Sequence, residues 1–247
     1  MQRKTLICGA TSAIAAEVAA LCAARGDRLY LIGRDQQKLT ALEARCGGAV
    51  VGSLSADLTE VDAAATRVAA AISALGGCDR ALIAHGYLGD QLRTEREVAY
   101  MQRTVDTNFV SAVALLMPLA DHFEQQGRGH LAAITSVAGV RGRPRNYTYG
   151  ASKAALSCYL QGLRSRLYPR GVRVHDLKLG PVATPMSEGH PQNALWGEKQ
   201  KVARGILIAM ERRRHTVYLP PSWRWVMAIV RQLPEAVFQR FGFLAGR

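Results

Sequence analysis

The sequence predicts an α/β fold in which about seven parallel strands form one open, doubly wound sheet with helices on both faces. The first observation is a regular alternation along the chain, because short apolar runs typical of buried strands are separated by longer Ala-rich stretches of helical character. The second is composition, since 49% hydrophobic residues with only 6% aromatic ones suit a layered fold rich in Ala, Val and Leu. The third is length, because 247 residues fit one domain with a large core.

The predicted elements follow one another in a strand–helix order. Strands are expected over residues 4–8, 29–33, 49–54, 80–84, 131–134, 172–177 and 217–219. Helices are expected from the loop at 9–15 to about residue 25, from an N-cap at Asp35 to residue 45, over 60–75, over about 94–125, and from Tyr149 onward. Pro118 is the candidate kink in the helix over 94–125.

The last part of the chain has a different character. Residues 1–221 are expected to form one α/β domain, and residues 222–247 an amphipathic, basic C-terminal tail. In the tail, apolar residues share one helical face: Trp223, Val226, Val230 and Leu233. Two interpretations stay open, namely an interfacial helix on an anionic membrane and an amphipathic helix packed on its own domain or a sister subunit.

The charge balance is strongly basic, with 32 Lys and Arg against 19 Asp and Glu and a net charge of +13. This balance suits either an anionic partner or a solubilising surface. No nucleic-acid-binding motif is present, so nucleic acid is not a predicted partner. No run of 18 apolar residues and no signal-peptide pattern occurs, and the five scattered cysteines lack metal-ligand spacing. We therefore expect buried cysteines and no metal site in a cytoplasmic protein. If the tail is an interfacial helix, we expect it to contact the inner face of the membrane.

The stretch 131–153 carries the residues with the clearest chemistry. A predicted buried strand ends at Ser136, and Tyr149 opens an Ala-rich helix after a loop of Gly, Arg and Pro. Tyr149 and Lys153 are four residues apart and therefore lie on one helical face. An ammonium group at that position lowers the pKa of a phenol, so Tyr149 is a candidate proton donor near neutral pH. Ser136 can hydrogen-bond the same carbonyl oxygen that Tyr149 protonates.

Ser136 precedes Tyr149 by 13 residues, and the set of three resembles the active site of the short-chain dehydrogenase/reductase family. The resemblance implies that Tyr149 donates the proton, Lys153 lowers its pKa and holds the cofactor ribose, and Ser136 stabilises the developing oxyanion. It also implies that Asn108, in the run Val-Asp-Thr-Asn, supports a proton-relay water. Tyr147 has no Lys at the same spacing and does not match the family motif.

The first strand–loop–helix unit also resembles this family. The family pattern Thr-Gly-x-x-x-Gly-x-Gly keeps only Gly9, with Ala13 and Ala15 at the other two glycine positions. Gly9 allows a tight turn and the close approach of a pyrophosphate to the N-terminus of the next helix. The resemblance therefore implies a Rossmann-type dinucleotide site, whose expected loop contacts are Gly9, Thr11, Ser12 and Ile14.

The end of the second predicted strand selects between the two nicotinamide cofactors. An acidic residue there would bind a ribose 2′-hydroxyl, whereas Arg34 can pair with a 2′-phosphate. We therefore predict NADP(H), with the alternative that Arg34 is a solvated residue at a helix start. Asp57 resembles the adenine-contacting Asp of the family or, alternatively, caps the next helix.

Two later segments complete the implied cofactor site. The family's Asn-Asn-Ala-Gly corresponds to residues 83–86, which lack both asparagines, and His85 is expected to be a hydrogen-bonded structural residue. The family's Pro-Gly-x-x-x-Thr segment, which holds the nicotinamide, corresponds to residues 179–184. The loop at about 186–197 would then be the mobile substrate lid. The implied contacts in these segments are Ala84, Gly86, Pro181, Val182 and Thr184.

The resemblance implies an NADPH-dependent oxidoreductase that reduces a carbonyl to a hydroxyl, acting as a dimer or tetramer. The tail, the run at 84–90 and the loop at 10–15 are similar to a bacterial branch that includes the decaprenylphosphoryl-2-keto-ribose reductases. That branch implies a lipid-linked keto-sugar substrate. One alternative is a soluble reductase of a small keto or acyl-thioester substrate. The other, favoured by the altered glycine loop, is a non-catalytic NADP(H)-binding sensor or interaction module.

Overall fold

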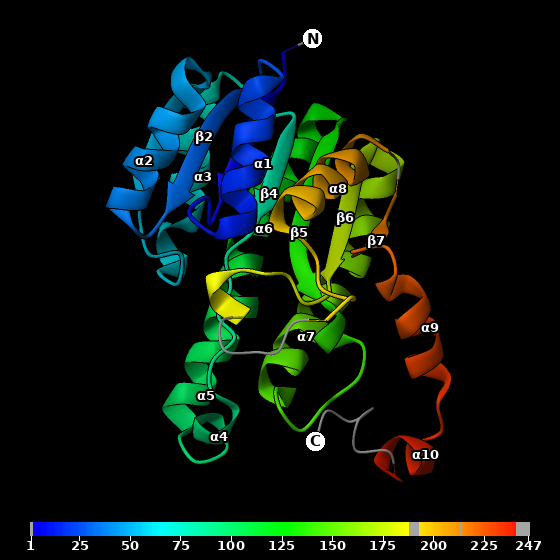
Figure 1. Cartoon of the computed structure of the whole chain (residues 1–247). Coiled ribbons are helices and arrows are strands. Elements are labelled where there is room, and N and C mark those ends of the chain that lie inside the picture. The colour runs from blue at the N-terminus through cyan, green and yellow to red at the C-terminus, as the bar shows by residue number, and fades with distance from the viewer. Residues whose placement is uncertain (1, 188–192, 213, 241–247) are drawn as a thin grey trace.

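The computed structural model describes residues 2–187, 193–212 and 214–240. Within these residues seven strands form one parallel sheet in the order β3-β2-β1-β4-β5-β6-β7, which confirms the predicted doubly wound sheet (Figure 1). The boundaries agree with the sequence-based ones to within one or two residues. The strands are β1 Lys4–Cys8, β2 Arg28–Gly33, β3 Val50–Ser55, β4 Arg80–Ile83, β5 Gly129–Ser136, β6 Val172–Leu179 and β7 Thr216–Leu219.

Helices cover the sheet on both sides, and a separate apolar core fills each side. One core cluster joins the sheet to α3, α6 and α7, and a second joins it to α1, α2 and α8. The Ala-rich sequence of these helices allows them to lie close to the sheet and to each other. Their bounds are α1 Ala13–Ala24, α2 Gln36–Cys46, α3 Ala64–Leu75, α6 Ser111–Gln126, α7 Tyr147–Leu167 and α8 Lys199–Glu211.

The strand order reverses at β1, which lies between β2 and β4. Chain crossovers leave β1 and β4 in opposite directions, so no helix covers the crevice at the carboxyl ends of these two strands. Ligands of open α/β sheets bind at such a point. The fold therefore places the loops that follow Cys8 and Ile83 side by side at one edge of the sheet.

The helical segments expected over about residues 94–125 are separate elements in the structure. They are α4 Gln91–Thr94, α5 Val98–Val105, a π-helical turn Asp106–Val110, and α6, which runs through Pro118 without ending. The irregularity predicted at Pro118 therefore lies at the π turn instead. Asn108 is at the centre of this turn and is buried. Single π turns inside helices are frequent at functional sites.

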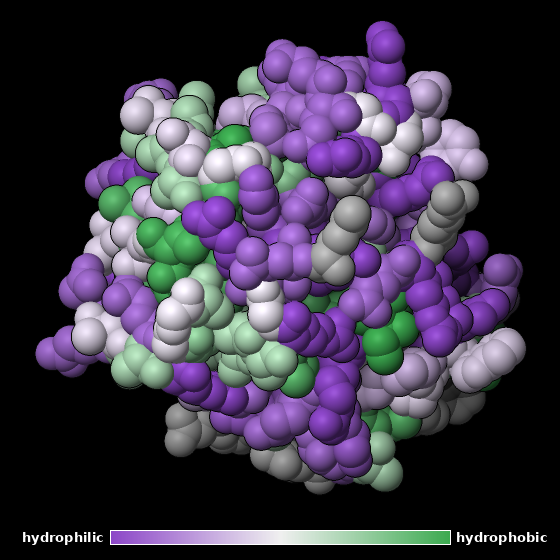
Figure 2. Space-filling view, turned by 90° about the horizontal axis from the view of Figure 1, so that it is seen from above, coloured by the Kyte–Doolittle hydropathy of each residue, from purple (hydrophilic) through white to green (hydrophobic). Residues whose placement is uncertain are grey.

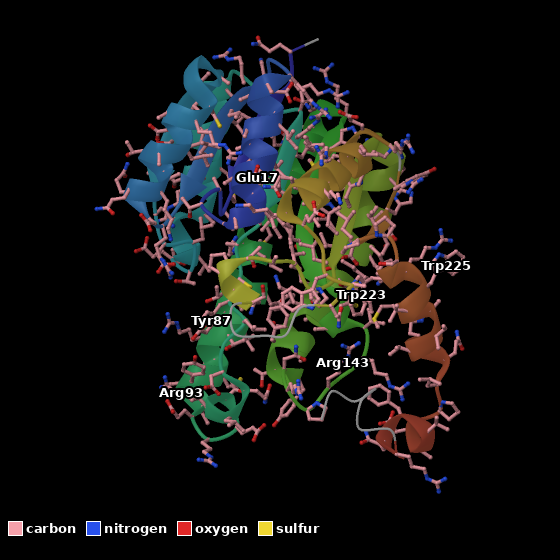
Figure 3. The ribbon with its side chains drawn as sticks, in the orientation of Figure 1. Glu17, Tyr87, Arg93, Arg143, Trp223 and Trp225 are labelled. Atoms are coloured by element: carbon pink, nitrogen blue, oxygen red, sulfur yellow. The ribbon has the colours of Figure 1, made fainter. Side chains whose placement is uncertain are left out.

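The C-terminal segment packs against its own domain through one helical face. In α9, Trp223–Gln232, the buried side chains are Trp223, Met227 and Val230, and they join Val137 and Phe238 in a third apolar cluster. Val226 and Leu233, which were expected on this face, are only partly buried. Trp225 points outward with 68% of its surface exposed (Figure 3). A short helix, α10 Glu235–Arg240, follows, and residues 241–247 of the predicted tail lie outside the described residues.

The face at the top of Figure 1 is covered mainly by hydrophilic side chains, and hydrophobic ones occur there in small groups between them (Figure 2). No helix in the described part of the chain is long and apolar enough to cross a membrane. Four cysteines are buried as predicted, but Cys158 is exposed on α7. The expectation of five buried cysteines is therefore wrong for Cys158, because its position on α7 faces away from the sheet.

Candidate active site

A cavity of about 1090 Å³ opens at the carboxyl ends of the strands, where the order of the sheet reverses. This volume is at the upper end of the range for ligand sites, about 300–1,000 Å³, and suits a large ligand such as a dinucleotide. The cavity brings together nearly all the residues that the sequence singled out. Those that line it are Gly9, Thr11, Ser12, Ile14, Arg34, Asp57, Ala84, Gly86, Ser136, Tyr149, Lys153, Pro181, Val182 and Thr184.

The loop after β1 contains a position that only glycine can occupy. Gly9 has φ +82°, and a β-carbon there would lie 2.4 Å from the backbone nitrogen of His85. The backbone nitrogens of Gly9 and Ala10 both donate to the carbonyl of Ile32, at 2.8 Å each, so the turn is fixed against β2. The loop therefore keeps the tight geometry of a phosphate-binding turn with one glycine.

The helix that begins at this loop is α1, and its N-terminus faces the cavity. Ser12 is the N-cap residue, and its hydroxyl accepts a hydrogen bond from the backbone nitrogen of Ala15 at 3.3 Å. Ala15 is fully buried in the core, so its methyl group packs against the sheet and leaves the cavity free. Ala13 lines the cavity. Ala13 and Ala15 stand at two glycine positions of the family pattern. Of these two residues, only Ala13 therefore adds a methyl group to the cavity wall.

The end of the cavity that lies next to the C-terminus of β2, here called the far end, carries basic side chains. Arg34 is exposed and lines the wall together with Lys38. The neighbouring carboxylate, Asp35, caps α2 by accepting from the backbone nitrogen of Lys38 at 3.0 Å, and it pairs with the Lys38 ammonium at 3.3 Å. Asp35 is thus occupied, and no ion pair joins it to Arg34 among the described residues. An unpaired guanidinium at this position suits a phosphate.

Asp57 lies at the same end of the cavity, and its carboxylate is held in place by Thr59. Its Oδ1 accepts from the Thr59 backbone nitrogen at 2.9 Å and from the Thr59 hydroxyl at 2.8 Å. These hydrogen bonds, together with the charge of Arg34, lower the pKa of Asp57. The sequence left open whether Asp57 contacts a ligand or caps a helix. Asp57 lines the cavity and holds a turn through Thr59, but it caps no helix, since the N-cap residues of the next two helical elements are Glu60 and Ala63.

His85 follows β4 and is a partly buried, neutral residue. Its Nε2 lies 2.8 Å from the hydroxyl of Ser111, which donates to the carbonyl of Thr107 at 2.9 Å. Because that hydroxyl uses its proton on Thr107, His85 carries its own proton on Nε2. Burial lowers the pKa of His85 to about 3. The interpretation of His85 as a hydrogen-bonded structural residue agrees with these contacts, although its Nδ1 finds no partner in the described part of the chain.

Asn108 lies behind the cavity wall and holds the segment after β4. Its Oδ1 accepts from the Tyr87 backbone nitrogen at 2.9 Å, and its Nδ2 donates to the carbonyls of Tyr87 at 2.7 Å and of Thr104 at 2.9 Å. A β-carbon on Gly86 would lie 2.9 Å from Asn108 Oδ1 and 3.2 Å from Lys153 Nζ. Asn108 and Lys153 therefore face each other across Gly86, and any side chain at this position would collide with both.

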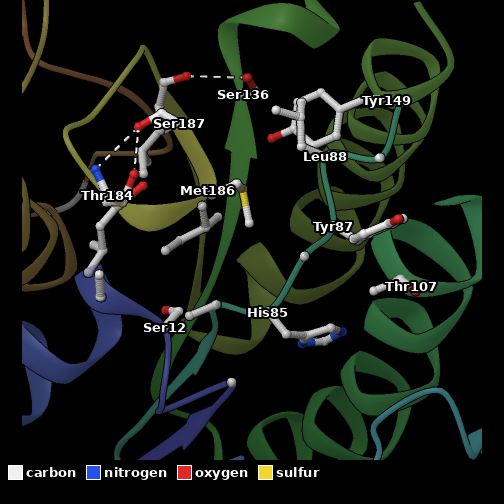
Figure 4. A pocket seen from close by; sticks show the side chains of 18 of the residues that line it. Ser12, His85, Tyr87, Leu88, Thr107, Ser136, Tyr149, Thr184, Met186 and Ser187 are labelled. Carbon is white, nitrogen blue, oxygen red and sulfur yellow. Dashed lines mark hydrogen bonds between the residues drawn. The ribbon is translucent and has the colours of Figure 1, made fainter. Parts of the chain in front are cut away.

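Ser136 and Tyr149 stand together on one wall of the cavity (Figure 4). Ser136 ends β5, where its hydroxyl accepts from the Ala138 backbone nitrogen at 3.1 Å and donates to the carbonyl of Leu179 at 3.4 Å. Tyr149 lies in the first turn of α7, which begins two residues earlier than predicted. Burial raises the pKa of Tyr149, and its hydrogen bond with Ser136 partly opposes that shift. Tyr147, by contrast, is 46% exposed and outside the cavity wall.

Lys153 is buried one turn further along α7, beneath Tyr149. Its Nζ donates to the carbonyl of Ile134 at 3.0 Å and lies 5.9 Å from the centre of the Tyr149 ring. Burial lowers the pKa of Lys153 to about 8, and the charge of Asp176 partly opposes this. Lys153 is not among the influences on the pKa of Tyr149, which burial raises, so the expectation that Lys153 lowers this pKa stays a prediction.

The segment after β6 closes the cavity on the side opposite the glycine loop. Ser187 fastens this segment, because its hydroxyl lies 2.7 Å from the Val182 carbonyl and accepts from the Thr184 backbone nitrogen at 3.2 Å (Figure 4). Met186 and Trp196 line the wall as well. The predicted lid at 186–197 therefore borders the cavity at both of its ends, while residues 188–192 lie outside the described residues.

Sequence reasoning missed several residues of the wall. Tyr87 and Tyr100 are joined by a hydrogen bond between their hydroxyls, and Arg103 lies 5.0 Å over the Tyr87 ring. Tyr87 could have been suspected from its place directly after Gly86. No sequence signal marks Tyr100 or Arg103, which lie on α5 and reach the cavity from there. Other missed residues are Lys38, Thr59, Thr107, Arg143 and Asn146.

Comparison with known proteins assigns the family. The model of the short chain dehydrogenase family matches residues 3–194. An uncharacterized oxidoreductase of Streptomyces coelicolor is 35% identical over 243 residues, which cover 96% of this chain and 95% of the relative. An uncharacterized oxidoreductase of Mycobacterium tuberculosis H37Rv is 34% identical over 238 residues, 95% of each chain. A solved structure of a short chain dehydrogenase/reductase family protein has a TM-score of 0.77 at 28% identity, covering 87% of this chain and 94% of that one.

The chain therefore belongs to the short-chain dehydrogenase family, and it is an oxidoreductase of that type. Proteins of this family bind a nicotinamide dinucleotide and act on small-molecule substrates. The residues present fit such a cofactor. Gly9 leaves a cradle that a β-carbon would fill, α1 presents its N-terminus, and Gly86 keeps the wall open beside Lys153.

Proposed function

We propose that the protein is an NADPH-dependent reductase that converts a carbonyl group into a hydroxyl. The observation that carries the proposal is the meeting of Ser136, Tyr149 and Lys153 on one wall of a cavity whose other end has the features of a dinucleotide site. When bound, the reduced nicotinamide supplies the hydride. The residues of the chain then have to bind and orient the two reactants and provide the proton.

The preference for NADP(H) is argued from the far end of the cavity. Arg34 and Lys38 line it, and the one carboxylate beside them in sequence, Asp35, is engaged by Lys38. A 2′-phosphate would give Arg34 a partner, and a charge-assisted hydrogen bond of this kind is about twice as strong as a neutral one. Gly9, Thr11, Ser12 and Ile14 are the proposed contacts of the pyrophosphate, and Asp57 that of the adenine.

The proton is proposed to come from Tyr149. Since its pKa is raised, the phenol keeps its proton at neutral pH and can give it to an oxygen that gains negative charge. Ser136 can donate to the same oxygen, because its present acceptor, the Leu179 carbonyl, is 3.4 Å away and weakly held. Lys153 has a pKa of about 8, so its ammonium form predominates at pH 7 and can stabilise a phenolate once the proton has left.

Asn108 is proposed to act by position. It holds the backbone of Tyr87 by two hydrogen bonds and faces Lys153 across Gly86, so it fixes the distance between the β4 loop and α7. Its proposed role is to support a proton-relay water next to Lys153. Pro181, Val182 and Thr184 are the proposed contacts of the nicotinamide, and the segment 186–197 is the proposed lid. The proposed assembly is a homo-oligomer, and the proposed location is cytoplasmic.

A keto-sugar carried by a lipid remains the proposed substrate type, with a small soluble keto compound or an acyl thioester as the second candidate. The exposed Trp225 and Ile229 on α9 favour the first if they face a membrane, where a lipid-linked substrate would be found.

The test is a pair of tyrosine variants. Tyr149→Phe should abolish NADPH-dependent reduction of ketones while NADPH affinity, measured by fluorescence titration, stays close to that of the wild type. Tyr147→Phe is the matched control, since Tyr147 lies on the same helix but is exposed, and it should keep full turnover. Unchanged turnover in Tyr149→Phe would refute the mechanism. Turnover by neither variant nor the wild type, with NADPH bound, would support a sensor or interaction module.

A further inference from the structure

Arg143 is a partly buried cation whose side chain has no partner in the described part of the chain. Its Nε is hidden from solvent and finds no acceptor, and no carboxylate of the described residues forms an ion pair with it. Burial lowers the pKa of Arg143, and no neighbouring charge contributes to that shift. A guanidinium keeps its proton at all physiological pH values, so this site carries a full positive charge.

Other buried arginines of the chain have partners of their own. Arg80 pairs with Asp27 at 3.4 Å. Arg164 donates to the carbonyls of Val174 at 3.1 Å and His215 at 3.0 Å. Such partners are the rule, because a charge removed from water is costly unless an opposite charge or several hydrogen bonds replace the water. Arg143 is only partly buried, but no acceptor of the described residues replaces the water that its Nε has lost, and an unpartnered guanidinium at a cavity wall points to a ligand.

The position of Arg143 puts it beside the reacting groups. It belongs to the loop that joins Ser136 to Tyr149, and it lines the same cavity as both (Figure 3). Asn146, at the N-terminus of α7, also lines the cavity, and its side chain makes no capping hydrogen bond. The side chains of Arg143 and Asn146 can therefore both donate hydrogen bonds to a ligand in the cavity, at the end where Tyr149 lies. Both residues lie in the loop that precedes the proposed proton donor, Tyr149.

The opposite wall strengthens the positive charge of this end. Arg103 of α5 lines it, with its guanidinium over the Tyr87 ring. The carboxylate of that wall is Asp90, whose Oδ1 already accepts from the Arg93 backbone nitrogen at 3.2 Å and caps α4. A ligand entering between these walls meets two guanidinium groups, those of Arg103 and Arg143, that form no ion pair with a carboxylate of the described residues.

We propose that Arg143 binds an anionic group of the substrate, so that the carbonyl compound reduced here carries a phosphate or a carboxylate. The inference rests on the proposed function and names its substrate class. Phosphate and carboxylate both match the planar fork of a guanidinium with two parallel hydrogen bonds. Bound in this way, the anion supplies the partner that Arg143 lacks and holds the carbonyl at a fixed distance from Tyr149 and Ser136.

Calorimetric titration of protein saturated with NADP⁺ tests the proposal. The probes are phenyl phosphate, benzoate and the uncharged benzyl alcohol, all at one ionic strength, so the first two distinguish a phosphate site from a carboxylate site. The variants are Arg143→Gln, which removes the charge, and Arg143→Lys, which keeps it without the fork. Arg145→Gln is the matched control, because Arg145 is in the same loop but exposed and outside the cavity wall.

We expect one of the two anions to bind the wild type, and to bind it more tightly than benzyl alcohol does. Arg143→Gln should weaken that binding about tenfold or more, as expected for hydrogen bonds to a charged group, Arg143→Lys should recover part of the loss, and Arg145→Gln should bind as the wild type does. Thermal unfolding and NADPH titration of each variant establish that the loss is not one of folding or of the cofactor site.

Three results would overturn the inference. They are failure of both anions to bind the wild type, equal affinity in Arg143→Gln, and an equal loss in Arg145→Gln. Each of these in a protein that binds NADPH and reduces a ketone would leave the proposed function intact. Loss of NADPH binding and of all reduction in the wild type would instead count against the proposed function.

Discussion

Replacement of Lys153 by Met should change the way in which the stability of the protein depends on pH. Burial lowers the pKa of Lys153 from 10.5 to about 8 in the folded chain. Between these two values the unfolded chain holds a proton that the folded chain has released, so the free energy of unfolding rises with pH in this window. Below pH 8 the folded chain carries a buried ammonium, and Lys153 makes its full unfavourable contribution. The Met variant has no group that titrates at this position.

The magnitude follows from the size of the shift. A change from 10.5 to about 8 corresponds to about 3 kcal/mol, at 1.36 kcal/mol for each pKa unit. Met also leaves the Ile134 carbonyl without its donor, at a cost of about 1–3 kcal/mol, but that cost does not depend on pH. The wild type should therefore gain about 3 kcal/mol relative to Lys153→Met between pH 7.5 and 10.5.

Urea denaturation of both proteins without cofactor, at half-unit steps of pH, measures this difference. Comparison with the variant removes the titration of the other groups, among them the buried thiols of Cys8 and Cys78, whose pKa burial raises to about 12. A difference in the free energy of unfolding that stays constant across the window would show that Lys153 keeps an ordinary pKa. A difference that moves in the opposite direction would show that a neighbouring negative charge raises it.

Two further predictions concern the fold around the site. Gly9→Ala should lower the free energy of unfolding by about 1–3 kcal/mol and weaken NADPH binding, because alanine is strained at φ +82° and collides with His85. Gly48→Ala, where an added methyl meets open space, should leave both quantities unchanged, and an equal effect of the two would refute the argument. Trp223→Ala should cost about 3–5 kcal/mol because Trp223 is buried between α9 and the domain. Trp225→Ala should change the stability by less than about 0.5 kcal/mol, and equal losses would show that α9 does not pack as described.

Periodic features of the sequence predict the sheet well, and they single out the three residues of the proposed catalytic set that the structure brings to one cavity. Apolar runs bounded by glycine and polar residues place each strand to within one or two residues, since a strand buried on both faces needs a continuous apolar run. Tyr149 and Lys153 follow from a fixed spacing on a helix, and Ser136 from its place at the end of a strand. Gly9 follows from the turn that a strand and a helix need between them.

Features that depend on contacts between distant segments are not predictable in this way. Asn108 lies in the π turn, and its side chain forms hydrogen bonds with the backbone of Tyr87 and Thr104. Tyr87 lies 21 positions away in the sequence. The raised pKa of Tyr149 depends on how deeply the phenol is buried, which neither its neighbours in sequence nor the spacing to Lys153 indicates. The unpartnered state of Arg143 likewise exists only in three dimensions, because it is defined by which acceptors do not reach the guanidinium.

The claim that the cavity is an NADPH site is tested most directly by fluorescence titration of the purified protein with NADPH and NADH. The wild type should bind NADPH more tightly than NADH. Arg34→Ala should weaken NADPH binding about tenfold or more and leave NADH binding unchanged, because it removes only the partner of the 2′-phosphate. Arg145→Ala, at an exposed position outside the cavity wall, should behave as the wild type does. Equal binding of the two nucleotides, or an Arg34→Ala variant that loses none of its affinity for NADPH, would contradict the assignment of the cofactor. Binding of neither nucleotide would contradict the reductase itself.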